Sequence, residues 1–464
     1  MKISILCGTP RARQHSVSHA YIDFLVNHYS DHEIAVFPIS RTIRKLESKG
    51  DRFDALVKGI AEADIILWQI PVYSAAAPAQ VVSFVELIFS DKSLKRGFKG
   101  KYTASISTSL NLFDNCVHEY LQAVSEDLDM VYTGNFPGTF SALRITPAYR
   151  RKLIGFVDAL IWYRTKGTPV SRLYPKSRAT PPIDWSVVAK PRVATTSTSG
   201  KTITVVTDCA DEESNLWQMI SQFKARCGAE VRIFNLAQTD FDGCRSCLRC
   251  TENMTCSIND NFQPLHDAYI RDANGLIIAG DIRYRYLSAK LKTFFDRCFF
   301  NNHLPYLKGR PLGLIISGEL SHNAPLKESL QSILEVRGGS ILGIVSDESA
   351  DAQQIADTLG GLAERFVRTM ISDSAPPVGF HSVSATTVLR DFVYIARFPL
   401  IADFEYFRKN HFATFPQRRL KLLVQAVAMT ALSKIQSHEK VLRKWKKMRN
   451  AGLRKAFDLE PFDS

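Results

Sequence analysis

Residues 2–18 read KISILCGTPRARQHSVS, a short apolar run that ends in a turn and a polar loop before a helical pattern begins. Further apolar runs follow at residues 33–39, 64–73, 102–107 and 130–134, and helical patterns separate them. Near-continuous apolar strands that alternate with helices indicate a parallel sheet covered by helices on both faces. Residues 1–165 are therefore expected to form a doubly wound α/β domain around a five-stranded parallel sheet.

The same alternation occurs a second time. Residues 166–200 contain five prolines and end in ATTSTSG, a composition that buries little and is typical of an interdomain linker. Apolar runs then recur at residues 203–208, 230–236, 275–280, 311–318 and 340–347. APAQVVSFVELIF at residues 77–89 parallels YLSAKLKTFFDRCF at residues 286–299, which indicates a duplicated ancestor. We expect a second five-stranded domain over residues 201–373 and a basic, aromatic and helical tail over residues 374–464.

The charge of the chain is concentrated near its C-terminus. The net charge is +13, and residues 381–464 hold sixteen Lys or Arg against seven Asp or Glu, so the body is close to neutral. A neutral body argues against a nucleic-acid groove, while a basic tail favours a local surface contact. The first apolar run is too short for a signal peptide, and no run is long enough to span a bilayer. We expect a cytoplasmic protein, with a peripheral position at the inner membrane face as the second location that the tail allows.

The tail itself admits three interpretations. Residues 420–435, LKLLVQAVAMTALSKI, form an apolar helical pattern, and residues 440–455, KVLRKWKKMRNAGLRK, are basic around Trp445. These helices could dock on the domains with a solvated basic face, or attach to anionic lipid at a membrane surface. Binding of a protein partner or a nucleic acid is the third interpretation.

The loops that follow the strands are the candidate binding residues, because ligands of open parallel sheets lie at the carboxyl ends of the strands. Residues 8–18 offer hydroxyls, two arginines and the backbone N–H groups of a helix N-terminus, which suits a phosphate. The alternative is a loop with an N-cap serine and solvated arginines. Residues 71–78, PVYSAAAP, could pack against a flat heterocycle or form a plain strand-to-helix turn. The loop of residues 107–109, after the fourth apolar run, could form the third side of the same binding site.

GTPR and SVS within residues 8–18, followed by PVYSAAAPAQVVSFVE at residues 71–86, resemble the NADPH-dependent FMN reductase group of flavodoxin-like proteins. The resemblance implies two tandem flavodoxin-like domains, an FMN cofactor and NAD(P)H as electron donor. It implies that the FMN phosphate is held by Thr9, Arg11, Ser16, Val17 and Ser18. It implies that the isoalloxazine ring lies along Pro71, Val72, Tyr73 and Ser74, with Thr108 and Ser109 on the remaining side.

Four of the nine cysteines lie within thirteen residues, at Cys244, Cys247, Cys250 and Cys256. Cysteine thiolates are soft ligands, and two-residue gaps let successive thiolates converge on an iron–sulfur cluster or on zinc. Structural zinc sites separate their ligand pairs more widely, so the spacing favours a 4Fe-4S cluster over zinc or inert buried thiols. The motif resembles the iron–sulfur flavoproteins, in which the cluster relays electrons to or from FMN.

The functional motifs are divided between the halves. The first loop of the second half, residues 207–215, lacks the GTPR pattern and holds four carboxylates, which disfavour a phosphate. We therefore expect FMN in the first domain and the cluster in the second. The expected function is that of an NAD(P)H-dependent flavin oxidoreductase or an electron-transfer flavoprotein, and the sequence shows no evident catalytic acid or base. A small-molecule or protein redox partner and a homodimer are expected. The alternative is a non-enzymatic binding or assembly protein with a vestigial fold, structural zinc and a membrane-surface tail.

Overall fold

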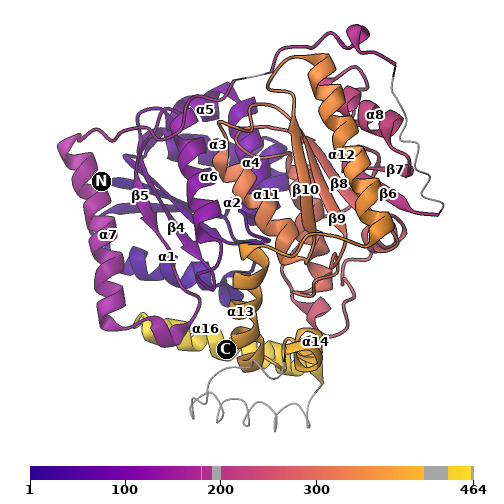
Figure 1. The fold of residues 1–464 in the computed structure, drawn as a ribbon. Helices are drawn as coiled ribbons and strands as arrows, with labels where there is room; N and C mark the ends of the chain where they lie inside the picture. Colours follow the sequence, from indigo (N-terminus) through magenta and orange to yellow (C-terminus); the bar gives the residue numbers. More distant parts are fainter. Residues whose placement is uncertain (179, 191–199, 412–436, 461–464) are drawn as a thin grey trace. The chain divides into compact units, whose positions relative to one another are not determined.

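The computed structural model describes residues 1–178, 180–190, 200–411 and 437–460, and Figure 1 shows its elements. The chain divides into two compact units, each of which contains segments distant in sequence. The first unit consists of Met1–Lys176, Gly243–Glu252 and Asp391–Ser464. The second consists of Ser177–Asp242 and Asn253–Arg390. Each unit contains one five-stranded sheet in which all recorded strand pairs are parallel.

The first sheet has the strand order β2-β1-β3-β4-β5. Its strands are β1 (Lys2–Cys7), β2 (Glu33–Phe37), β3 (Ile65–Pro71), β4 (Tyr102–Thr108) and β5 (Val131–Phe136). The second sheet has the equivalent order β7-β6-β8-β9-β10. Its strands are β6 (Thr202–Thr207), β7 (Glu230–Asn235), β8 (Gly275–Asp281), β9 (Pro311–Ser317) and β10 (Ser340–Ser346). This order is that of flavodoxin, so the predicted pair of flavodoxin-like sheets is confirmed.

Helices connect successive strands in both units. The first unit contains α1 (Val17–His28), α2 (Ile39–Glu47), α3 (Asp51–Glu62), α4 (Ala79–Ser90), α5 (Lys92–Phe98), α6 (Asp114–Asp127) and α7 (Pro147–Lys166). The second contains α8 (Asn215–Arg226), α9 (Phe262–His266), α10 (Ala289–Arg297), α11 (Ala324–Val336) and α12 (Ala352–Ser372). The sequence pattern does not predict α2 and α5, because helices of nine and seven residues carry too few periodic positions to stand out.

The central strands β1, β3 and β4 are buried on both faces, whereas β2 and β5 at the edges are partly exposed. Successive side chains of a strand point to opposite faces of the sheet. On β4, Ala104 and Ile106 join the apolar cluster beneath α1 and α7, whereas Thr103, Ser105 and Ser107 belong to the opposite face. The hydrogen bond between Ser105 and His118 shows that α6 covers that opposite face. The first sheet therefore has an apolar side and a side with buried polar groups, and the latter leads to the candidate site.

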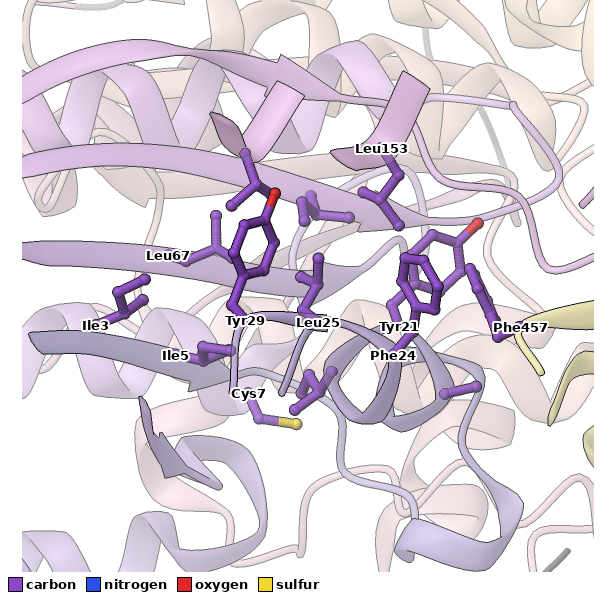
Figure 2. Packing of buried hydrophobic residues seen from close by; sticks show 14 of the residues in the cluster. Ile3, Ile5, Cys7, Tyr21, Phe24, Leu25, Tyr29, Leu67, Leu153 and Phe457 are labelled. Atoms are coloured by element: carbon purple, nitrogen blue, oxygen red, sulfur yellow. The ribbon is translucent and has the colours of Figure 1, made fainter. Parts of the chain in front are cut away.

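The C-terminal region adds α13 (Phe380–Ile395), α14 (Ile401–His411) and α16 (His438–Ala456). Phe457, just after α16, packs against Tyr21 and Phe24 of α1 with ring centroids 4.9 and 4.8 Å apart (Figure 2). Leu453 is fully buried in the same cluster. The basic helix predicted at residues 440–455 therefore docks on the first unit, as the first interpretation of the tail expects.

The apolar pattern at residues 420–435 lies outside the described residues. Within the described part of the chain, no helix combines the length and the apolar character needed to cross a membrane.

Candidate functional site

The loop after β1 gathers hydroxyl groups at the N-terminus of α1. Ser16 caps this helix, with its Oγ accepting a hydrogen bond from the backbone N–H of His19 (3.4 Å) and donating to Thr9 Oγ1 (3.3 Å). The backbone N–H of Gly8 donates to Gln69 O (2.9 Å), and a Cβ at Gly8 would lie 2.4 Å from Ile70 Cδ1. A side chain at this position would press against Ile70 and Val81, so glycine lets the loop pass close to β3.

Ser18 joins this loop to the end of β4. Its Oγ lies 2.9 Å from Thr108 Oγ1, so the first and third predicted loops meet. The Val17 side chain is buried in the apolar cluster, so Val17 can serve a ligand only through its backbone. The first N–H groups of a helix have no partner within that helix. The hydroxyls of the loop and the N-terminus of α1 thus form one polar surface suited to an anion.

The loop after β3 forms a tight turn. Tyr73 and Ala76 exchange backbone hydrogen bonds of 2.8 and 3.0 Å, and the two residues between them, Ser74 and Ala75, have φ values of 45° and 52°. Left-handed backbone at non-glycine residues costs roughly 1–2 kcal/mol each. The sequence gives no sign of this turn, because neither position holds the Gly or Asn that usually marks it.

The second unit keeps the same turn with different side chains. Arg283 and Tyr286 exchange backbone hydrogen bonds of 2.6 and 3.1 Å, and Tyr284 and Arg285 between them have φ values of 49° and 73°. A strained backbone retained after its sequence has changed is a trace of the duplication. In the first unit the backbone N–H of Val72 also donates to Thr108 O (3.3 Å), which ties this turn to the other two loops.

A buried polar network supports the third loop. Asp114, in the first turn of α6, accepts hydrogen bonds from Ser107 and from Ser109 Oγ (2.5 Å). His118 Nε2 lies 3.0 Å from Ser107 Oγ, and its Nδ1 lies 2.7 Å from Ser105 Oγ. Burial raises the pKa of Asp114 and lowers the pKa of His118 to about 4, so His118 is neutral at pH 7. Sequence analysis missed this network because it depends on how α6 packs on β4.

Cations from the C-terminal helix lie at the first loop, and sequence analysis missed them as well. Arg449 donates to His15 O (3.2 Å), and Asn450 donates to Gln14 O. Burial lowers the pKa of Lys446 to about 8 and that of Arg449 to about 9, and the positive charge of Arg11 acts in the same direction on both. The loop predicted to hold a phosphate is therefore surrounded by more positive charge than its own sequence supplies.

Three of the four motif cysteines lie on the segment Gly243–Glu252, which belongs to the first unit. Gln80, at the start of α4, donates to Cys244 O (3.1 Å), and Arg11 Nε donates to Ser246 Oγ (2.9 Å). The backbone N–H of Ser246 donates to Cys244 Sγ (3.4 Å). The first three thiol residues are thus carried on a segment that contacts the first predicted loop and the start of α4, which follows the second predicted loop.

Ser246 and Leu248 have φ values of 51° and 61°, so the backbone between these cysteines turns twice through the left-handed region. Cys256 belongs to the second unit, where its backbone N–H donates to Gln263 Oε1 (2.9 Å). Among the described residues, which include all four motif cysteines, no group of three or more His, Cys, Asp or Glu side chains is arranged to hold a metal ion.

A family model decides the identity of the chain. The model described as NADPH-dependent FMN reductase matches residues 1–139 and again residues 202–349, which together make up more than half of the sequence. The chain belongs to the NADPH-dependent FMN reductase family. One match falls on each sheet, so this FMN reductase family member is a tandem duplication, as predicted.

Individual relatives are more distant. An iron–sulfur flavoprotein of Archaeoglobus fulgidus is 28% identical over 89 residues, a match that spans 19% of this chain and 40% of the relative. The NAD(P)H:quinone oxidoreductase of Methanothermobacter marburgensis aligns with a TM-score of 0.30 at 14% identity, over 37% of this chain and 97% of that one. The FMN-dependent NADH-azoreductase of Bacillus anthracis, solved with FMN, aligns with a TM-score of 0.29 at 12% identity, over 37% of this chain and all of that one.

The first sheet of this FMN reductase family member fits the cofactor of its family. Hydroxyls, the α1 N-terminus and Arg11 suit the phosphate, and the small side chains of Ser74 and Ala75 suit the approach of a flat ring. The predicted residues form two hydrogen-bonded pairs, Ser16 with Thr9 and Ser18 with Thr108.

The second sheet of the FMN reductase family member has an acidic edge instead. Asp347 accepts hydrogen bonds from Ser317 Oγ (2.8 Å) and from the backbone N–H of Gly318 (2.7 Å). Burial raises the pKa of Asp281, and the negative charges of Asp208 and Asp347 contribute to the rise. Carboxylates at this edge repel a phosphate dianion, so the expectation of FMN in the first half alone stays a prediction with a physical reason.

Proposed function

We propose that the chain is an FMN-dependent NAD(P)H oxidoreductase that binds one FMN at the carboxyl edge of the first sheet. The observation that carries this proposal is the meeting of three loops there, through the Ser18–Thr108 contact (2.9 Å) and the hydrogen bond from Val72 to Thr108 (3.3 Å). The matched family supports the cofactor and the electron donor. The division into a flavin-binding segment at residues 1–165 and a cysteine-bearing segment at residues 201–373 is part of the same proposal, with residues 243–252 of the latter belonging to the first compact unit.

Each loop has a distinct role in this proposal. Thr9, Arg11, Ser16 and Ser18 bind the phosphate through hydroxyl, guanidinium and α1 N–H groups. Pro71–Ser74 and the hydroxyls of Thr108 and Ser109 orient the ring, and Asp114 holds Ser109 by its 2.5 Å hydrogen bond. Bound FMN supplies hydride acceptance and one-electron release. The protein supplies position, exclusion of water and a neutral His118 beneath the third loop.

We further propose that Cys244, Cys247, Cys250 and Cys256 hold a 4Fe-4S cluster that exchanges electrons with this FMN and with a small-molecule or protein redox partner. The spacing of the four thiols supports the cluster. The N–H of Ser246 lies 3.4 Å from Cys244 Sγ, and an amide donor of this kind stabilises a thiolate ligand. The relative from Archaeoglobus fulgidus, itself named an iron–sulfur flavoprotein, also supports it.

Oxygen-free purification of the full chain tests both parts. The proposal expects flavin absorption from FMN, a broad shoulder from the cluster, four iron and four sulfide per chain, and reduction of a dye by NADH or NADPH. Cys244→Ser is expected to lose iron and sulfide but keep FMN, whereas the matched control Cys227→Ser keeps both. A colourless protein with stoichiometric zinc would overturn both parts and favour the non-enzymatic alternative. FMN without iron would overturn the cluster alone.

A further inference from the structure

The C-terminal helix α16 lies outside both segments that match the family model, yet it is fastened to the first loop. Two hydrogen bonds join its Arg449 and Asn450 to the backbone oxygens of His15 and Gln14. One turn further on, Arg454 forms an ion pair with the buried Asp23 of α1 (2.6 Å). Phe457 then anchors the end of the helix in the apolar cluster (Figure 2). The helix is therefore held against α1 along more than one turn.

The docked face of α16 carries positive charge along with its apolar residues. Leu442, Lys446, Arg449 and Leu453 follow one another at intervals of four, three and four residues, which places them on one face of the helix. Leu442 and Leu453 are buried and Lys446 and Arg449 are half-buried, whereas Arg443, Lys444 and Lys447 are exposed. An amphipathic helix that binds lipid would keep its cations on the polar face. Two cations of α16 instead share the docked face.

No carboxylate offsets these inward charges in the part of the chain that the structure describes. Arg11, Lys446 and Arg449 form no ion pair there, whereas Arg13 and Arg454 both pair with Asp23. The Nε of Arg449 and the Nδ1 of His15 are buried and have no hydrogen-bond partner among the described residues. Among the described residues the three cations donate to neutral acceptors: Lys446 to Cys247 O, Arg449 to His15 O and Arg11 to Ser246 Oγ. Positive charges partly withdrawn from water without a counter-ion are costly. Their grouping at a helix N-terminus therefore indicates a bound anion.

We propose that α16 completes the FMN phosphate site, with Lys446 and Arg449 joining Arg11 as ligands of the phosphate. This inference rests on the proposed function, and it makes the C-terminal helix part of the cofactor site instead of a membrane tether. A phosphate monoester carries close to two negative charges at pH 7. It offers enough acceptors to satisfy the three cations and the α1 N-terminus together.

Comparison of FMN with riboflavin tests the inference, because riboflavin lacks the phosphate. Apoprotein of the full chain is titrated with each flavin, and the dissociation constants are read from quenching of flavin fluorescence. Lys446→Met and Arg449→Met are each expected to weaken FMN binding about tenfold or more and to leave riboflavin binding unchanged. Lys447 is an exposed cation on the same helix, so Lys447→Met is the matched control, and its dissociation constant for FMN is expected to stay within twofold of the wild-type value. Lys446→Arg keeps the positive charge, and its dissociation constant for FMN is expected to stay within threefold of the wild-type value.

Two results would overturn the inference: unchanged FMN affinity in both methionine variants, or an equal loss for FMN and riboflavin. A loss of iron from Lys446→Met without a change in FMN preference would also overturn it, because the lysine would then serve the cysteine segment. Wild-type protein that binds no flavin would refute the proposed function itself. In that case calorimetric titration with inorganic phosphate decides the inference, which is supported if both methionine variants lose phosphate and overturned if they retain it.

Discussion

Truncation of Phe457 to alanine is expected to destabilise the first unit by about 3–5 kcal/mol, the usual cost of removing a buried phenylalanine. The side chain is 2% exposed and packs against the rings of Tyr21 and Phe24, with centroids 4.9 and 4.8 Å away. Both contacts are with α1, whose first turn carries the candidate phosphate loop. Loss of this anchor therefore loosens the helix that positions the site.

Hydrogen–deuterium exchange of α1 peptides is the appropriate assay, because a chain of two units need not unfold in one step. Amides in α1 that exchange through opening of the first unit are expected to exchange at least a hundredfold faster in Phe457→Ala. Peptides from α8 of the second unit serve as an internal reference. Phe380→Ala is the matched control, because Phe380 is 77% exposed. An acceleration below about fivefold in α1 would refute the docking of α16 and the reasoning built on it.

Two further predictions concern buried polar groups. Burial lowers the pKa of both His19 and His118 to about 4, whereas the ordinary value in an unfolded chain is about 6.5. Between these two pH values the unfolded state binds more protons than the folded state. The free energy of unfolding therefore falls as the pH drops from about 6.5 to 4. Denaturant titrations at pH 7 and pH 4.5 should show this fall, and His118→Asn should reduce it; a difference unchanged in the variant would contradict the assignment. Asp114→Ala removes the acceptor of Ser107 and Ser109 and is expected to cost about 1–3 kcal/mol of stability and to weaken FMN and riboflavin to a similar extent. Weaker binding of FMN with unchanged binding of riboflavin would show that this network supports the phosphate site and not the ring site.

Local sequence patterns predicted much of the fold. The apolar runs at residues 33–39 and 102–107 correspond to β2 and β4, because the pattern of a strand is written in consecutive residues. The candidate phosphate loop could also be proposed from the sequence, because its hydroxyls and arginines lie close together in the sequence between a strand and a helix. Matching of the two halves predicted the duplication.

The rest of the site depends on residues far apart in the sequence. The basic run around Trp445 does not by itself show whether its cations face lipid, water or the first loop. Their position depends on contacts with residues more than 400 positions away in the sequence. The contact between Arg11 and Ser246 is hidden for the same reason. The turn at Ser74 and Ala75 is hidden for a different one, because packing imposes a backbone conformation that these residues do not prefer.

Flavin stoichiometry in the full chain tests the central claim most directly. Equilibrium dialysis of FMN against oxygen-free apoprotein is expected to give one FMN per chain. Arg11→Glu, which places a carboxylate in the candidate phosphate loop, is expected to abolish this binding. Arg283→Glu, in the turn after β8 of the second unit, is expected to retain it. Binding of two FMN per chain would contradict the assignment of the cofactor to the first sheet. FMN binding that is retained in Arg11→Glu and lost in Arg283→Glu would contradict it as well.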